Sequence, residues 1–230
     1  MTRLCPAGFG GQAVPLLRLL QLFDSQFPVG AFAHSGGVET YAALGGGLAE
    51  LRDILEAQVA LGWGRSDLAA AYLTWRAAHH TKNGDSPLFS YGQRLDAVKV
   101  VPAVRNASIG LGRRTLELLR RLYPEAAVEI DPPHHAIVVG AAAARLGIDA
   151  RDLLLAYAQS LAMGTLAAAL RCMPVAPAQA QALLADLHPE LARAVERVLE
   201  DPEACLFTCT PALDLRSHQQ ASLRTRLFQS

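Results

Sequence analysis

The stretch DARDLLLAYAQSLAMGTLAAALRCM, residues 149–173, decides the fold class because it has the pattern of one long helix. Asp149 is a good N-cap residue, and Asp152 follows in the first turn, where a negative charge suits the positive end of the helix dipole. Ala and Leu, which keep side-chain freedom in a helix, fill most of the remaining positions. Pro174 then interrupts the pattern. We therefore predict a helix that extends from the cap at Asp149 to Met173.

The centre of this stretch, Leu153–Leu170, has no charged residue, so a membrane span is the alternative to a buried helix. Gln159, Ser160 and Thr165 interrupt the apolar run, and much of its apolarity comes from alanine. The charges that flank it do not form a basic anchor of the kind found beside membrane spans. We expect a buried central helix and no membrane contact.

The composition of the whole chain also indicates helices. The 230 residues carry a formal net charge of +0, and 51% of them are hydrophobic, which excludes a disordered chain. Ala and Leu together number 78, against 19 for Val and Ile, and this ratio favours helix over strand. The neutral balance gives no bulk electrostatic reason to bind nucleic acid or an anionic membrane. We predict an all-α fold.

Proline and glycine divide the chain into its other helices. The expected helices cover 14–23, 38–44, 48–79 (divided near Gly62 and Gly64), 88–101, 103–122, 134–146 and a last region after Pro177 that Pro189 divides. The leucine-rich run 14–23 is expected to be buried, and 81–87 and 124–133 to be loops. The predicted architecture is a single-domain bundle of about eight to ten helices over 14–207. A flexible segment, 1–13, precedes it, and a semi-attached C-terminal tail, 208–230, follows.

The cysteines and histidines do not have the spacing of a metal site. The four cysteines are Cys5, Cys172, Cys205 and Cys209, too few for a disulfide scaffold, so a reducing cytoplasm is the expected location. Cys205 and Cys209 lack a second ligand pair, and two buried thiols are the expected interpretation, although His218 keeps metal binding open as the alternative. We predict no bound metal and no cofactor.

No arrangement of residues indicates a catalytic centre. His34 and Ser35 are adjacent in a glycine-rich turn, but adjacency in sequence does not make a nucleophile and its base. Asp24 and Glu39 flank the same turn, so a small metal-dependent hydrolase that uses His34, Asp24 and Glu39 is an alternative. The prediction is a protein without catalytic residues.

The same turn is a candidate binding loop. Residues 32–39 are expected to form a structured loop that places His34, Ser35 and Glu39 at a partner-facing surface, because consecutive glycines allow a sharp turn. A structural turn, with His34 hydrogen-bonded inside the protein, is the alternative.

The helix expected at 103–122 carries a second candidate binding surface. Arg105, Ser108 and Gly112 share one stripe at i, i+3 and i+7, and Arg113 lies at its edge. Arginines can pair with carboxylates through two parallel hydrogen bonds, and small residues between them leave room for a partner. The prediction is a docking face for an acidic partner. Simple packing of this helix inside the protein is the alternative.

The tail is the third candidate surface. Its basic side chains precede an apolar end, and the residues concerned are Arg216, His218, Arg224, Arg226, Leu227 and Phe228. A polar segment with an aromatic residue near its end is typical of coupled folding and binding, so we predict that the tail becomes ordered on a partner. A terminus without function is the alternative.

Four segments, in this order, resemble the UreF family of urease accessory proteins. They are LQLFDS (20–25) with PVG (28–30) and FAHSGGVE (32–39), RNAS (105–108) with GRR (112–114), HHAIVVG (134–140), and PALDL (211–215) through TRLFQS (225–230). The resemblance covers about residues 14 to 230. One departure lies in the tail, where Gln219 and Gln220 stand in the region in which the family usually carries a Met and a His-Glu pair.

The resemblance implies a cytoplasmic, all-α protein without catalytic activity. Such proteins form homodimers, join a second accessory protein, UreD (also called UreH), and recruit the GTPase UreG. The assembly delivers nickel to apo-urease, and the UreF component modulates the GTPase. A generic helical scaffold unrelated to nickel is a further alternative, besides the hydrolase.

Overall fold

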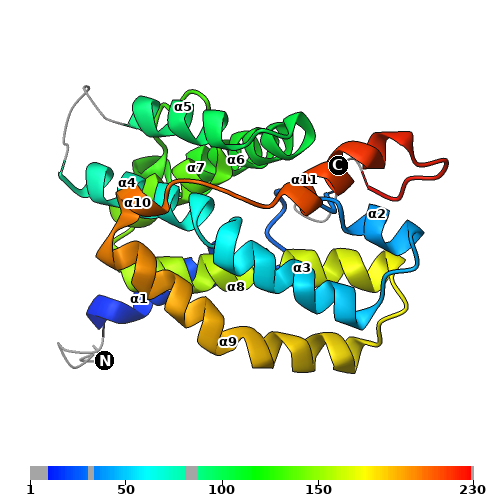
Figure 1. The fold of residues 1–230 in the computed structure, drawn as a ribbon. Helices are drawn as coiled ribbons and strands as arrows, with labels where there is room; N and C mark the ends of the chain where they lie inside the picture. The colour runs from blue at the N-terminus through cyan, green and yellow to red at the C-terminus, as the bar shows by residue number, and fades with distance from the viewer. Residues whose placement is uncertain (1–9, 31–33, 81–87, 229–230) are drawn as a thin grey trace.

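The computed structural model describes residues 10–30, 34–80 and 88–228, and within those ranges it contains helices and turns but no strand (Figure 1). The all-α prediction is confirmed. The predicted loop 81–87, the first residues of the predicted 32–39 loop, Cys5 and the last two residues of the tail lie outside the described residues.

The helices follow the predicted order. Their bounds are α1 Gly10–Leu22, α2 Val38–Ala43, α3 Leu48–Leu61, α4 Ser66–His80, α5 Leu88–Val98, α6 Pro102–Leu122, α7 His135–Arg145, α8 Ala150–Cys172, α9 Pro177–Glu200, α10 Pro202–Cys205 and α11 Pro211–Gln219. In the described part of the chain the 3₁₀ turns η2, Pro124–Ala126, and η3, Gln220–Ser222, accompany them. The predicted division near Gly62 is confirmed, since α3 ends and α4 begins on either side of it.

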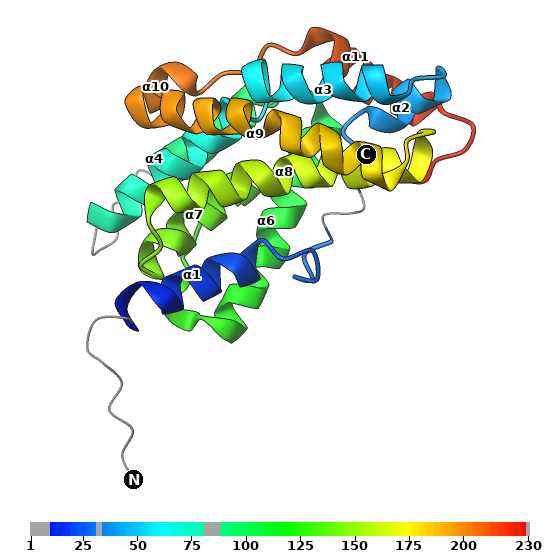
Figure 2. The same cartoon turned by 90° about the horizontal axis from the view of Figure 1, so that it is seen from below.

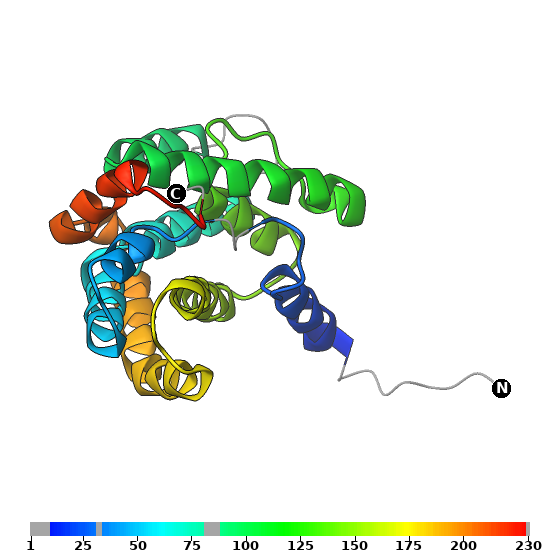
Figure 3. The same ribbon diagram turned by 90° about the vertical axis from the view of Figure 1, so that its right-hand side faces the viewer.

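Helix α8 lies in the centre of the molecule, with α9 and α3 on one side, α6 across the top and α1 beyond its other side (Figure 3). Its predicted cap is present, because the carboxylate of Asp149 accepts hydrogen bonds from the backbone N–H groups of Arg151 and Asp152. Within the described part of the chain, α8 is the one helix whose length and apolar composition would suffice to cross a membrane. Its contacts with α9, α2, α4 and α1 instead make it the core helix of a bundle.

Helices α4 and α7 form the most extensive helix pair, because both present small side chains. Ala69, Ala70 and Ala71 on α4 and most alanines of α7 are fully buried, which allows the two helix axes to approach closely. Helix α6 packs against α7, as Figure 2 shows, and α11 also contacts α6. This arrangement fixes α6 relative to the core.

Helix α1 differs from the prediction in its start and its burial. It begins at Gly10, inside the segment 1–13 that was expected to be flexible. Leu19 and Leu22 pack into the core, but Leu16, Leu17 and Leu20 are exposed, so the expectation of a buried helix is wrong for its outer face. The helix lies at the edge of the bundle, where only one of its faces meets α8 and its neighbours.

The prediction that Pro189 divides the last helical region is wrong, because α9 continues through this residue. Leu183, Leu187 and Leu191 form one buried stripe on both sides of the proline, and Pro189 itself is exposed. Burial of this stripe favours a continuous helix despite the backbone hydrogen bond that the proline removes.

Candidate functional site

The candidate docking stripe on α6 is divided between the interior and the surface. Ser108 is 8% exposed, and its Oγ lies 3.1 Å from Nδ1 of His134. Gly112 is buried against the same segment, where a Cβ atom would lie 1.8 Å from the carbonyl oxygen of Pro133. These two small residues make room for residues 133–134 of the protein itself. The prediction that they leave space for a partner is therefore wrong.

His134 connects α6 to α5. Its ring is fully buried, with Nδ1 beside the Ser108 hydroxyl and Nε2 3.3 Å from a carboxylate oxygen of Asp96. Burial lowers the pKa of His134, and the nearby charge of Lys99 lowers it further. A neutral imidazole fits this position: the Ser108 O–H can donate to Nδ1 while the Nε2 N–H points towards Asp96. The arrangement fixes α6 on the core.

The arginines of α6 lie on its outer side. Arg105 is partly exposed, and its Nε is 3.8 Å from the Asp96 carboxylate. Arg113 and Arg114 are exposed, whereas Arg120 and Arg121 pair with acidic neighbours at the surface. The basic edge that the sequence analysis predicted is thus present, without the small residues expected within it.

The C-terminal segment packs on α2, and a buried polar cluster joins them. Ser35 Oγ donates a hydrogen bond to the Gln220 side-chain oxygen (3.0 Å), and the Gln220 amide donates to the Glu39 carboxylate (2.9 Å). The second oxygen of Glu39 accepts the backbone N–H of Leu227. We call Ser35, Glu39, Gln220 and Leu227 the tail cluster. It uses Gln220, one of the two glutamines at which the tail departs from the family pattern, as the bridging residue.

Backbone and ring contacts also attach the tail. Thr40 donates a hydrogen bond from its hydroxyl to the carbonyl of Arg216 (2.8 Å). Gly37 has φ of +94°, and a Cβ there would lie 2.8 Å from the Ser217 hydroxyl, so the turn and α11 meet closely. Phe228 is 4% exposed and lies under the Arg171 guanidinium. The interpretation of this segment as semi-attached is therefore wrong up to Phe228.

The other candidate residues of the tail and turn have different positions. His218, Arg224, Arg226 and Leu227 are exposed, and Arg216 extends over the ring of Tyr41. His34 is half-buried, and burial lowers its pKa, with a further contribution from the charge of Arg114. The remaining two turn residues, Ser35 and Glu39, are buried in the tail cluster rather than placed at a surface.

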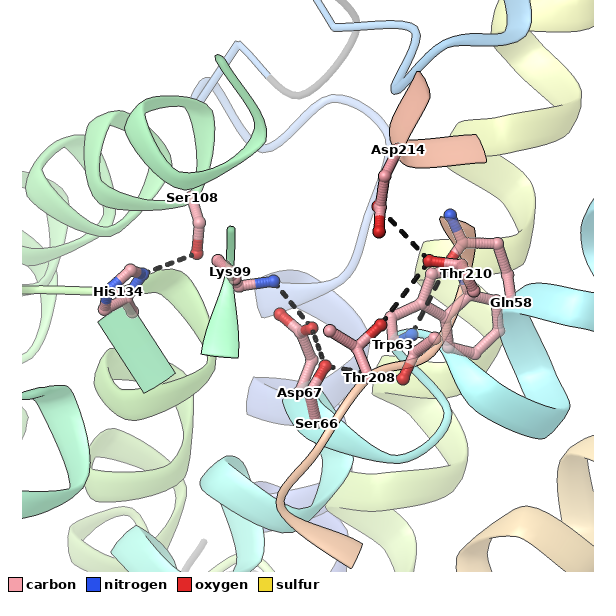
Figure 4. A network of polar contacts seen from close by, with 11 residues as sticks. Gln58, Trp63, Ser66, Asp67, Lys99, Ser108, His134, Thr208, Thr210 and Asp214 are labelled. Carbon is pink, nitrogen blue, oxygen red and sulfur yellow. Dashed lines mark hydrogen bonds and ion pairs between the residues drawn. The ribbon is translucent and has the colours of Figure 1, made fainter. Parts of the chain in front are cut away.

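Residues of α6, α8 and other helices line a cleft of about 240 Å³, among them Ser108 (Figure 4) and His34. Lys99 and Asp67 form a buried ion pair on its wall, with 2.7 Å between Nζ and Oδ2, and Ser66 donates a hydrogen bond to the same oxygen. Thr208, Thr210 and Asp214 also line the cleft. No sequence signal indicates Lys99, Asp67 or Trp63 as site residues, since they are distant in sequence and match no spacing rule.

The two cysteines with metal-ligand spacing, Cys205 and Cys209, differ in their exposure. Cys205 is buried and lies 3.5 Å from the Arg65 guanidinium, whereas Cys209 is exposed, so the expectation of two buried thiols holds only for Cys205. Among the residues that the structure describes, no three His, Cys, Asp or Glu side chains gather as a metal would require. Both carboxylates of the alternative hydrolase site accept hydrogen bonds from other parts of the protein. Glu39 accepts one from the side chain of Gln220, and Asp24 accepts one from the backbone N–H of Gln26.

The fold and these polar clusters define an all-α protein whose distinctive features are contacts between segments, a basic helix edge and an open cleft. Comparison with known protein families shows which family the chain belongs to. Residues 47–188 match the UreF family profile, and the chain belongs to the UreF family of urease accessory proteins.

Its relatives match along almost the whole chain. The urease accessory protein UreF of Nostoc sp. (strain PCC 7120) is 31% identical over 220 residues, which cover 93% of this chain and 95% of the relative. The UreF proteins of Trichormus variabilis and Haemophilus influenzae (strain PittEE) are each 30% identical, over 93% and 92% of this chain and 95% and 94% of their own length. The resemblance seen in the four sequence segments is thus confirmed.

Proposed function

We propose that this protein is an accessory factor for maturation of the urease nickel centre, without catalysis of its own. In this proposal it joins UreD (UreH), recruits and modulates the GTPase UreG, and so helps to deliver nickel to apo-urease. The observation that carries the proposal is the similarity to UreF proteins over more than nine-tenths of the chain. Nickel is the cargo of the assembly and needs no resident site in this chain.

The contact with UreG is assigned to the basic edge of α6. Arg113 is exposed and Arg105 is partly exposed, so both can reach a partner without a change in the core. Arginine forms bidentate pairs with carboxylates, which orient an interface as well as attract it. Ser108 and Gly112 contribute indirectly, because they hold α6 against residues 133–134.

The contact with UreD is assigned to the tail. His218, Arg224, Arg226 and Leu227 are exposed on a segment that the tail cluster holds in place, and Arg216 lies beside them on α11. Phe228 anchors the end of this segment under Arg171. In this proposal the tail presents an ordered basic surface, and Ser35 and Glu39 act by holding it. His34 lies between the tail and α6 surfaces, beside the cleft.

Homodimer formation is assigned to the outer face of α8. Leu155, Met163 and Leu170 are exposed large apolar side chains, and they lie on the helix that otherwise forms the core. Exposed apolar side chains of this kind on one element are typical of protein interfaces. Chromatography with light scattering tests this assignment, since Met163→Glu is expected to shift a dimer to a monomer.

Pull-down of UreG by the complex of this chain with UreD tests the α6 assignment. The double variant Arg105→Glu/Arg113→Glu is expected to lose UreG, because the reversed charges repel an acidic surface while the core is unchanged. Arg193→Glu, a charge reversal at an exposed position of α9, is the matched control and should capture UreG normally. Undiminished capture by the double variant, with circular dichroism showing a folded protein, would place the UreG contact elsewhere.

A further inference from the structure

A second cavity, of about 460 Å³, is lined by residues of α1, α4, α7 and α8. Pro15, Leu16 and Leu19 line it from α1, and Trp75 and His79 line it from α4. We call it the α1–α4 cavity. Helix α1 lies at the far end of the molecule from α11 and the tail (Figures 1 and 3), so this cavity is separate from the tail surface.

Aromatic rings of α4 form a stack that reaches this cavity. Trp75 stacks on Tyr72, with 6.2 Å between ring centroids, and on His79, with 5.0 Å. The Trp75 indole N–H donates a hydrogen bond to the carbonyl oxygen of Ile148 (2.9 Å), which fixes the ring. The guanidinium of Arg76 already lies over Tyr72, 5.9 Å from its centroid. Aromatic faces attract cations, so the rings that line the cavity can take a second one.

Two carboxylates, those of Asp149 and Asp152, line the same cavity, and no Lys or Arg of the described residues does. Both are exposed, and they lie one turn apart at the start of α8. One oxygen of Asp149 caps the helix, whereas the side chain of Asp152 has no hydrogen bond or ion pair within the described part of the chain. The positive end of the helix dipole is equivalent to about half an elementary charge, so two carboxylates leave this end of α8 negative.

The arginines nearest in sequence to the lining residues interact with other groups. Arg18 pairs with Glu125, and Arg151 pairs with Glu196. Arg145 donates a hydrogen bond to a backbone carbonyl. The negative charge of the cavity therefore remains available to a cation from outside the described chain.

We propose that the α1–α4 cavity binds an arginine side chain of a partner protein. Its guanidinium lies against the Trp75 and His79 rings and faces the Asp152 carboxylate, while its aliphatic stem packs on Pro15 and Leu16. Arginine fits this combination better than lysine does, because its planar, weakly hydrated head group stacks on aromatic faces and pairs with carboxylates. This inference goes beyond the contacts proposed for α6 and the tail and does not depend on them.

The test uses Trp75 as the reporter in the full-length protein. The probe is the blocked peptide acetyl-Gly-Arg-Gly-amide, and its addition should change the tryptophan emission to saturation. Trp63→Phe, in which Trp75 is the remaining tryptophan, should keep this change. The matched peptide with citrulline, which has the shape of arginine without its charge, should bind at least several-fold more weakly. Raising NaCl from about 0.05 M to about 0.5 M should weaken binding of the arginine peptide, because salt screens the carboxylates.

Variants of the lining residues test the position of the peptide. Asp152→Asn should weaken binding several-fold and reduce its salt dependence, since it removes one carboxylate and keeps the side-chain shape. Asp53→Asn, the same change at an exposed position of α3, is the matched control and should bind normally. His79→Ala removes a ring and should weaken binding, whereas His79→Phe keeps a flat ring and should retain it.

Four outcomes would overturn the inference. Two are equal affinity for the arginine and citrulline peptides, and full affinity in Asp152→Asn. The third is an emission change that follows protein concentration without peptide, which would assign the cavity to a second copy of this chain. The fourth is tighter binding of free arginine than of the blocked peptide, which would assign it to a small molecule. None of these measurements uses UreD or UreG, so failure of this inference and failure of the proposed function are distinguishable.

Discussion

Gly110 and Gly112 lie two residues apart on α6, but their surroundings are different. A Cβ at Gly112 would overlap the Pro133 carbonyl, whereas a Cβ at Gly110 would meet only the mobile end of the Arg114 side chain, at 3.9 Å. Gly112→Ala should therefore destabilise the protein by about 2 kcal/mol or more, as forced backbone shifts do. Gly110→Ala should stabilise it by about 0.5–1 kcal/mol, because alanine loses less backbone entropy in a helix.

Urea unfolding followed by circular dichroism measures both variants. Equal stabilities of Gly112→Ala and the parent protein would contradict the close packing of α6 on residues 133–134. The sequence predicted that Ser108 and Gly112 share a face of α6. It could not predict what faces them, because the contacting residues come from a loop that is distant in sequence.

Gln220 is the bridging residue of the tail cluster, and Gln219 beside it is exposed. Gln220→Ala leaves the buried Ser35 hydroxyl and Glu39 carboxylate without their amide partner, which should cost about 1–3 kcal/mol. Gln219→Ala, the matched control, removes a surface contact with Arg216 and should change the stability by less than about 0.5 kcal/mol.

Limited proteolysis gives a second measurement of this prediction. Gln220→Ala should be cleaved after Arg224 and Arg226 faster than the parent protein, since these sites follow the loosened bridge. Identical cleavage rates and stabilities for the two glutamine variants would contradict the tail cluster as the attachment of this segment.

His134 and His135 make the stability depend on pH. Burial lowers the pKa of both residues below the ordinary value of 6.5, and that of His135 to about 4. At a pH between the pKa of the unfolded state and the lower pKa of the folded state, the unfolded chain binds more protons than the folded one. The free energy of unfolding should therefore fall as the pH drops from about 7 towards 4. The limiting slope is about 1.4 kcal/mol per pH unit for each histidine.

Urea titrations at several pH values test this slope. His135→Leu replaces the imidazole with an apolar, uncharged side chain at this partly buried position and should flatten the dependence. His188→Leu, at an exposed position of α9, should leave it unchanged. A stability that rises on acidification in this range would contradict the buried, neutral state of both imidazoles.

At the scale of the element, α9 offers a test of Pro189. The proline is inside the helix and removes one backbone hydrogen bond, while the buried leucine stripe holds the helix together. Pro189→Ala should therefore raise the free energy of unfolding by about 1–3 kcal/mol. Pro177→Ala is the matched control: Pro177 is the first residue of the helix, where proline is favourable, so no gain is expected. Similar effects of the two substitutions on thermal unfolding would contradict the continuous helix.

Helix limits were predictable where the sequence contains local signals. The cap at Asp149, Pro102 at the start of α6 and the glycines between α3 and α4 each act within one turn, and the structure has boundaries at all three. The attachment of the tail was not predictable, because it depends on Ser35 and Glu39, which precede it by more than 180 residues. The continuity of α9 likewise depends on burial, which local proline rules do not include.

At the scale of the whole molecule, the fold class followed from composition and helical periodicity. The all-α bundle and the central position of α8 are found as predicted. The cleft could not be predicted, since α3, α4, α6, α8 and α11 each contribute a few of its residues. Trp63 and Lys99 have no sequence signal of their own, and only the packing of the helices brings them to one space.

The proposed role of this chain in nickel loading of urease can be tested in cells. The most direct measurement is the nickel content of urease purified from cells that carry the urease subunits and every other accessory gene, with or without this chain. We expect nickel-poor, inactive urease when the chain is absent or carries Arg105→Glu/Arg113→Glu. Normal loading is expected with the parent chain or with the control Arg193→Glu. Fully loaded, active urease in cells without the chain, in medium with limiting nickel, would contradict the proposed role.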